Sequence, residues 1–121
     1  MKNTFSIKKN SEFSLVYKKG KRYSGKLVIL YVLKSYKQKD LLSNYVGITA
    51  SKKTGKSVKR NRLKRLVKEN YRAFEPSLST GFFMVFVLRS VVGVPDFWAY
   101  SREMKYLLKK ANILELRTNE E

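Results

Sequence analysis

One basic segment governs the fold of this chain: Ser51-Lys-Lys-Thr-Gly-Lys-Ser-Val-Lys-Arg-Asn-Arg-Leu-Lys-Arg-Leu-Val-Lys-Glu-Asn-Tyr-Arg72. Core-type positions recur in it with the 3.6-residue period of an α-helix, in one stripe that has a single polar member. The stripe consists of Leu63, Leu66, Val67, Asn70 and Phe74. We expect a helix over residues 57–74, because Glu75 precedes Pro76 and a residue before proline avoids the helical conformation.

The same segment carries an extreme positive charge. From Lys52 to Arg72 it has ten Lys and Arg residues against one Glu, so its net charge of +9 is half of the +18 of the whole chain. Like charges one turn apart destabilise a helix in water, so we expect a polyanion, above all a nucleic acid, to cover this one. The triplet Arg60-Asn61-Arg62 suits structured RNA, since two guanidinium forks can bind phosphates while the amide between them contacts a base edge.

Two other interpretations of this helix are open. An ordinary solvated surface helix interleaves both signs of charge, whereas acidic partners four residues away are almost absent here. An amphipathic helix on an anionic membrane is disfavoured, because the apolar stripe has no Trp and is needed to cover a sheet. The charge pattern therefore favours RNA.

The composition limits the chemistry that the chain can perform. At 121 residues with 43% apolar side chains it fits one domain, which we place at residues 1–117, followed by a frayed polar tail at 118–121. Without Cys or His it lacks disulfides, thiolate metal sites and the commonest general base. Its nine Asp and Glu residues are scattered, so we expect no catalytic residue and no metal site in the protein. With no signal peptide and no apolar run long enough to cross a bilayer, we expect a cytoplasmic location.

The other periodic segments predict an α+β protein with one sheet backed by helices. We expect a helix over Asn10–Lys19, capped by Asn10 or Ser11 and ended by Gly20. Strands are predicted at Lys26–Leu33, Ser43–Ala50 and Gly81–Arg89, and a last helix begins near Pro95-Asp96. The first two strands are joined by a lysine-rich loop and are expected to pair antiparallel.

A phosphate-binding motif is approximated just before the basic helix. Residues 50–57 come close to the nucleotide-binding pattern G-x-x-x-x-G-K-S/T, between a predicted strand and a predicted helix. However, Ala50 replaces the first Gly, and the later buried strand runs into Arg89 rather than a magnesium-binding Asp. Nucleotide hydrolysis is therefore a weak alternative, and the loop can equally hold RNA phosphates.

An aromatic set is the third candidate site. It comprises Phe13, Tyr17 and Tyr31, with Lys52 and Lys53 predicted to lie beside it. These rings could stack unpaired bases in a cleft between the first helix and the sheet, although plain core packing would explain Phe13 equally well.

These segments together closely resemble the signature of the bacterial ribonuclease P protein family. The resemblance is strongest at Ser51-Lys-Lys-x-Gly-x-x-Val-x-Arg60-Asn61-Arg62-Leu-Lys64-Arg65-Leu66. It extends to Lys9-Asn-x-Glu-Phe13-x-x-Val16-Tyr17-x-x-Gly20, to Val46-Gly47-Ile48, to Phe82–Arg89 and to the last helix, so nearly the whole chain is covered. One departure is Ser57, where the family usually has Ala.

The resemblance implies a particular fold. The expected architecture is an α-β-β-β-α-β-α sandwich with a four-stranded sheet, similar to the ribosomal protein S5 domain 2-like fold. The basic helix would join two parallel strands by a left-handed crossover, against the usual right-handed rule. A short additional strand would fall near Lys21–Ser24.

The resemblance also implies a function, that of the protein subunit of an endoribonuclease. In this family a large catalytic RNA holds the magnesium and cleaves precursor tRNA to give the mature 5′ end, while the protein binds that RNA and the single-stranded 5′ leader. Residues expected to contact the catalytic RNA are Lys56, Lys59, Arg60, Asn61, Arg62, Lys64, Arg65 and Lys68. Residues expected to bind the leader are Phe13, Tyr17, Tyr31, Lys52, Lys53 and Arg89. We expect no membrane and no obligate protein partner. A rival, a ribosomal structural protein, would share the small basic fold but would not need the aromatic cleft.

Overall fold

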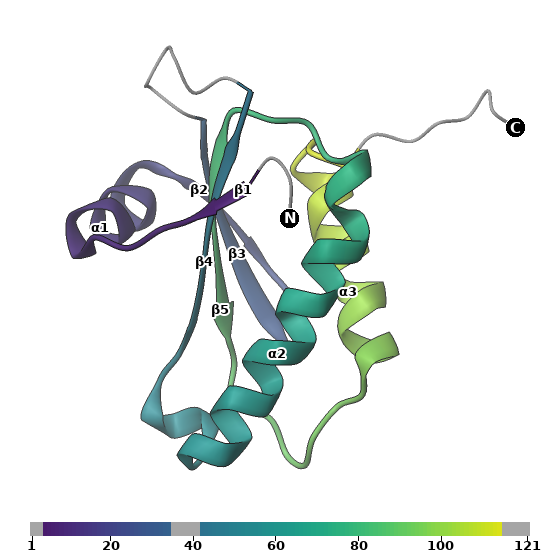
Figure 1. The fold of residues 1–121 in the computed structure, drawn as a ribbon. Helices are drawn as coiled ribbons and strands as arrows, with labels where there is room; N and C mark the ends of the chain where they lie inside the picture. Colours follow the sequence, from purple (N-terminus) through teal and green to yellow (C-terminus); the bar gives the residue numbers. More distant parts are fainter. Residues whose placement is uncertain (1–3, 35–41, 115–121) are drawn as a thin grey trace, which may run out of the picture.

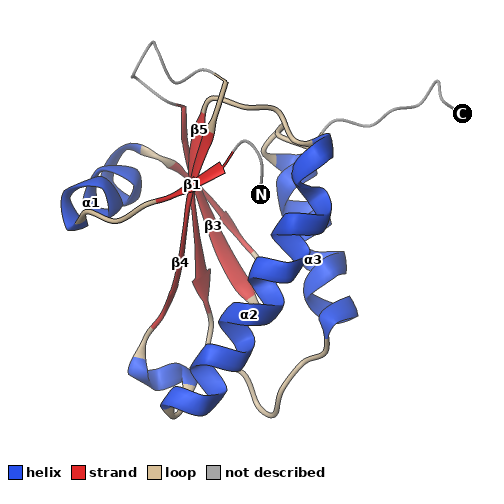
Figure 2. Ribbon diagram, in the orientation of Figure 1, coloured by secondary structure: helices blue, strands red, loops and turns tan. Residues whose placement is uncertain are grey.

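The computed structural model describes residues 4–34 and 42–114, which form one mixed β-sheet with helices on both faces (Figures 1 and 2). The strands are β1 (Thr4–Ser6), β2 (Lys21–Ser24), β3 (Val28–Lys34), β4 (Asn44–Ala50) and β5 (Phe82–Leu88). The helices are α1 (Asn10–Lys19), α2 (Ser57–Phe74) and α3 (Phe97–Lys110), with short 3₁₀ turns at η2 (Lys52–Thr54) and η3 (Glu75–Ser77). Most of the predicted lysine-rich loop and the whole predicted tail at 118–121 lie outside the described residues.

The sheet has the order β1-β4-β5-β3-β2. β5 runs parallel to β4 and antiparallel to β3, so Phe86 lies between Ile48 and Leu30. The expected antiparallel pairing of the Lys26–Leu33 and Ser43–Ala50 strands is therefore wrong, because β5 separates them. β5 is buried almost throughout, and the hydrophobic effect places such a strand at the centre of the sheet, covered on both faces. α2 joins two neighbouring parallel strands, as the resemblance implies.

The expected count of four strands is also wrong. The short strand anticipated near Lys21–Ser24 is present as β2, but a fifth strand, β1, pairs parallel with the outer edge of β4. Three residues are too few to show a period of two, so no sequence pattern marked β1. The element order is consequently β-α-β-β-β-α-β-α.

The two faces of the sheet bury cores of different size. α2 and α3 cover one face over a large cluster that includes Leu30, Leu63 and Phe86, whereas α1 alone packs on the other over a small cluster around Val16 and Val85. Figure 2 shows the strands as a single layer with α1 on one side and the two longer helices on the other. In this view α1 lies near one end of its face, and among residues 4–34 and 42–114 no other α-helix packs on that face.

α2 has the predicted bounds, Ser57–Phe74, and continues directly into η3. Its buried residues are Leu63, Val67, Asn70 and Tyr71, while Leu66 and Phe74 are half-buried. Tyr71 was outside the predicted stripe. Its hydroxyl lies 2.7 Å from Thr4 Oγ1 of β1, a hydrogen bond that satisfies a buried tyrosine hydroxyl.

The caps of α1 and α3 differ in how well they were predicted. α1 spans Asn10–Lys19 and Gly20 follows it as expected, but Lys9 occupies the N-cap and makes no side-chain capping bond, so the predicted Asn10 or Ser11 cap is wrong. Asp96 caps α3 as expected, since its Oδ1 accepts a 2.9 Å hydrogen bond from the Ala99 amide.

Candidate nucleic-acid interface

The outward surface of α2 and its N-cap Lys56 gather the predicted RNA-contacting residues, all of them cations except Asn61. Lys56, Asn61, Arg62, Arg65 and Lys68 are exposed, and Lys59, Arg60 and Lys64 are partly exposed. Because Leu63 and Val67 fasten the opposite side of the helix to the core, the cations cannot rotate inward. Val58, Asn61, Arg62 and Arg65 line one shallow depression on this surface. The helix thus presents a fixed row of positive charge to a polyanion.

Two of these cations also donate hydrogen bonds to other residues of the protein, and the charge pattern did not predict these bonds. Arg60 donates from Nη1 to the carbonyl oxygen of Gly55 at 2.9 Å and from Nη2 to Ser57 Oγ at 3.3 Å. Lys59 Nζ donates to the carbonyl oxygen of Val91 at 2.9 Å, tying α2 to the β5–α3 loop. Of the two arginines in the triplet, Arg62 is exposed to solvent, whereas Arg60 is only partly exposed.

The loop between β4 and α2 is a compact turn rather than a nucleotide cradle. Ala50 is still part of β4, η2 follows, and the Gly55 carbonyl is occupied by Arg60. Lys52 and Lys53 are exposed on this turn, and Ser90 Oγ donates to the Lys53 carbonyl oxygen at 3.0 Å. Among residues 4–34 and 42–114, no three Asp or Glu side chains gather to hold a metal ion. The geometry gives no support to the nucleotide-hydrolase alternative.

The aromatic set forms a row on the α1 face of the sheet. The Phe13 and Tyr17 ring centroids are 6.5 Å apart, and the Tyr17 and Tyr31 centroids are 5.0 Å apart in a T-shaped contact. Tyr17 is 40% exposed and its hydroxyl lies 3.5 Å from Thr49 Oγ1. The structure therefore brings together the three rings that the sequence suggested, with Tyr17 as the most accessible.

Phe13 has a packing role as well as an accessible edge. Its ring lies directly on the backbone of Gly47 in β4, and a Cβ at Gly47 would collide with it. Phe13 also packs against the small core of the α1 face. The core interpretation of Phe13 and the base-stacking interpretation are thus both compatible with its position.

α1, which carries Phe13 and Tyr17, and α2, which carries the cations, lie on opposite sides of the sheet (Figure 1). The β4–α2 turn begins just after Thr49 and Ala50, and the Tyr17 hydroxyl lies 3.5 Å from Thr49 Oγ1. Arg89 follows β5 at the same end of the sheet, where its amide donates to the Leu27 carbonyl oxygen. It lies four residues beyond Val85, the β5 partner of Tyr31, so it stands next to the β2–β3 turn rather than against the rings.

Known proteins with similar sequences decide the family. The family model described as Ribonuclease P matches residues 1–112. A Clostridium perfringens ribonuclease P protein component is 44% identical over 118 residues, which cover 95% of this chain and 92% of that protein. A ribonuclease P protein component of Clostridium beijerinckii is 39% identical over 112 residues, or 90% of each chain. The chain belongs to the ribonuclease P protein family.

Solved structures of ribonuclease P proteins share the fold. A Staphylococcus aureus RNase P protein mutant described as defective in mRNA degradation activity is 25% identical, with a TM-score of 0.80 over 91% of this chain and 90% of that one. The RNase P protein from Thermotoga maritima is 27% identical, with a TM-score of 0.75 over 87% of this chain and 96% of that one.

Family membership gives the protein an RNA partner. A ribonuclease P protein is an RNA-binding component of a ribonucleoprotein that acts in tRNA processing, which agrees with the strong positive charge of the chain. The ribosomal-protein alternative is thereby set aside. That the cations of α2 contact this RNA stays a prediction. Within the part of the chain that the structure describes, no helix has the length and apolar character needed to span a bilayer.

The structure also groups residues that sequence reasoning left apart. Lys26 of the β2–β3 turn, Arg89 after β5, and Arg102 and Tyr106 of α3 line one pocket. Arg89 alone among them was predicted to bind RNA. They are far apart in the chain, and the α3 pair shows no pattern beyond that of a solvated helix surface, so no sequence signal could have joined them.

Proposed function

We propose that this chain is the protein subunit of ribonuclease P, that it binds the catalytic RNA through the outward face of α2, and that it binds the single-stranded 5′ leader of precursor tRNA through the aromatic row. The observation that carries the proposal is the placement of two different RNA-binding chemistries on opposite sides of one sheet. Exposed guanidiniums suit the phosphates of a folded RNA, and exposed rings suit unpaired bases. Lys52 and Lys53 belong to η2 between β4 and α2, and we assign this exposed turn to the place where leader and catalytic RNA approach each other.

The contribution of the protein to cleavage is electrostatic and positional. Cations on α2 and the adjoining turn reduce the repulsion between two large RNAs and release condensed counterions. Binding of the leader on one side of the scissile bond positions the substrate, which lowers the entropic part of the activation barrier to cleavage.

The residues of the described chain do not fit a protein-held magnesium ion. Glu103, Glu75 and Asp96, for example, are each engaged by backbone or hydroxyl donors at separate places in the fold. We therefore assign the magnesium on which cleavage depends to the RNA subunit, and the phosphodiester chemistry with it. Several further expectations accompany this proposal and stay predictions. Composition predicts a single domain over residues 1–117 and a cytoplasmic location, and we expect no obligate protein partner. The resemblance implies a left-handed β4–α2–β5 crossover and a likeness to the ribosomal protein S5 domain 2-like fold.

The proposal is tested by cleavage of a precursor tRNA by the cognate catalytic RNA at low magnesium, with and without the protein. We expect strong stimulation that is lost when the leader is trimmed to one nucleotide. Equal stimulation of substrates with the full leader and with a one-nucleotide leader would contradict leader binding. Tight RNA binding without any stimulation would contradict the whole assignment and favour a general RNA-binding role.

A further inference from the structure

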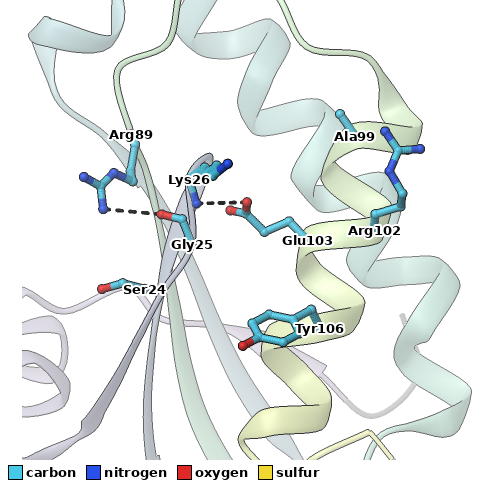
Figure 3. A pocket seen from close by; sticks show the side chains of 8 residues that line it. All are labelled: Ser24, Gly25, Lys26, Arg89, Ala99, Arg102, Glu103 and Tyr106. Carbon is cyan, nitrogen blue, oxygen red and sulfur yellow. Dashed lines mark hydrogen bonds between the residues drawn. The ribbon is translucent and has the colours of Figure 1, made fainter.

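A pocket of about 810 Å³ opens at the end of the sheet, between the β2–β3 turn, the end of β5 and α3 (Figure 3). We call it the β2–α3 pocket. Its lining includes Gly25, Lys26, Arg89, Arg102, Glu103 and Tyr106. The predicted leader-binding set shares only Arg89 with this pocket.

The wall formed by the β2–β3 turn is rigid because Glu103 holds it. Glu103 Oε1 accepts from the Lys26 amide at 2.9 Å, and Oε2 accepts from the Leu27 and Val28 amides at 2.7 Å each. Gly25 lies so close to this carboxylate that a Cβ there would collide with it. Three amide donors therefore engage Glu103, the one carboxylate among the described residues of the lining, and the turn is fixed before any ligand arrives.

The remaining charges in the lining are positive and reach solvent. Lys26, Arg89 and Arg102 are all exposed, so the lining carries three cations against one engaged carboxylate. Arg89 uses Nη1 to hold the Gly25 carbonyl oxygen at 3.3 Å, which keeps its guanidinium at the pocket edge. In Figure 3 Arg89 and Arg102 stand on opposite sides of the pocket, one on the sheet and one on α3.

An exposed aromatic ring completes the pocket. Tyr106 is 58% exposed and extends from α3 toward the β2–β3 turn (Figure 3). Lys110 Nζ lies 5.6 Å from its ring centroid, a cation–π contact that steadies the ring. An exposed aromatic ring does not contribute to binding free phosphate. Single-stranded RNA, in contrast, combines phosphates with bases that stack on aromatic faces.

The pocket adjoins the β4–α2 turn, whose Lys52 and Lys53 belong to the predicted leader-binding set. Arg89, another member of that set, lines the pocket, and Oγ of the next residue, Ser90, donates to the Lys53 carbonyl oxygen at 3.0 Å. We propose that the β2–α3 pocket binds leader nucleotides farther from the cleavage site, after the strand has passed the aromatic row and Arg89. This inference rests on the proposed function, since it extends the path of the same leader.

The test uses the holoenzyme and precursor tRNAs whose leaders grow from one to about twelve nucleotides. Substrate affinity is measured at each length for the wild type and for Arg102→Ala and Tyr106→Ala. The matched controls are Lys105→Ala, which removes an exposed cation of α3 that does not line the pocket, and Tyr106→Phe, which keeps the ring. All five proteins should unfold at nearly the same temperature, because the substituted side chains are exposed.

We expect wild-type affinity to rise with leader length in two stages. Arg102→Ala and Tyr106→Ala should abolish the second stage, binding long leaders about five-fold more weakly while binding the shortest leaders normally. Both controls should follow the wild type. An equal loss of substrate affinity at every leader length, or no loss at all, would contradict RNA binding in the β2–α3 pocket. Neither result would contradict leader binding by the aromatic row. A flat wild-type response would instead contradict the proposed leader binding itself.

Discussion

Arg60 donates from Nη1 to the carbonyl oxygen of Gly55 at 2.9 Å, so the first arginine of the basic triplet braces the turn that leads into its own helix. Arg62, two residues later, is exposed. The two arginines, although both belong to the family signature, therefore have different principal tasks.

Arg60→Ala should lower the free energy of unfolding by about 1 kcal/mol, because it removes the bond to Gly55 and the weaker one to Ser57 at the start of α2. Arg62→Ala should leave stability within about 0.5 kcal/mol of the wild type, as exposed substitutions usually do. Urea unfolding of the two variants measures the difference. Equal stabilities would mean that the Arg60 bonds contribute nothing in water.

Arg62→Ala combined with Arg65→Ala should weaken binding to the catalytic RNA and make it less sensitive to salt. Losing two phosphate contacts should reduce the slope of log affinity against log salt by about 1.4–1.8. A matched control is Lys105→Ala with Lys109→Ala, which removes the same charge from α3. An identical slope for the α2 double variant and the wild type would show that these arginines do not contact RNA phosphates. Replacing Arg60 together with Arg62 should change the slope similarly, but with the added loss of stability.

Tyr17→Ala should weaken binding of leader-bearing substrate by about 1–3 kcal/mol and spare mature tRNA, because Tyr17 is the most accessible ring of the aromatic row. Tyr17→Phe keeps the stacking face and should bind as the wild type does. The comparison requires holoenzyme affinities for precursor and mature tRNA. Equal losses of affinity for precursor and mature tRNA would show that the Tyr17 ring does not bind the leader.

Phe13→Ala should reduce leader affinity by a similar amount and should also destabilise the protein, because the Phe13 ring packs on the Gly47 backbone and on the small core. Thermal unfolding separates the two effects, and Tyr17→Ala serves as the partner that loses a ring without losing a core contact. A Phe13→Ala protein of normal stability would contradict the packing role, and one with normal leader affinity would leave Phe13 as core alone.

Tyr100→Phe should make the protein less sensitive to alkali. Burial, with a smaller contribution from the nearby Glu103 carboxylate, raises the pKa of Tyr100 to about 12. A folded-state pKa above the unfolded value of about 10 means that this residue destabilises the fold progressively as pH rises from about 10 to about 12. The buried hydroxyl has no hydrogen-bond partner among the described residues, so Phe should cost little at neutral pH. Urea unfolding at several pH values would contradict this prediction if the wild type and the variant lost stability in parallel.

Periodicity predicted the helices and the three long strands, because each buries one repeating stripe or a continuous apolar run. α2 even has the predicted bounds, since Leu63 and Val67 supply its buried stripe and Pro76 supplies its stop. Strand order was not predictable in the same way. The insertion of β5 between β3 and β4 depends on which strand is most completely buried, and this is a property of the assembled sheet.

The candidate RNA interface was predictable to the extent that it depends on local charge. The cations on α2 and the rings on α1 follow from residue type and spacing. The bonds of Arg60 to Gly55 and of Lys59 to Val91 do not, because they depend on loops whose paths no short pattern specifies. The burial of Tyr71 was not predicted for a similar reason. The partner of its hydroxyl, Thr4, lies in β1, 67 residues away in the chain.

The central position of β5 has a consequence for biosynthesis. Synthesis runs from the N-terminus, so β3 and β4 emerge from the ribosome before the strand that separates them, and each exposes unpaired backbone groups until Leu88 has been made. The nascent chain therefore cannot close its sheet step by step and must wait for a long-range contact. We expect this requirement to slow folding and to leave an intermediate that is prone to aggregation. Nascent chains halted before Phe82 should accordingly be protease-sensitive, and those that have released Lys110 should be resistant.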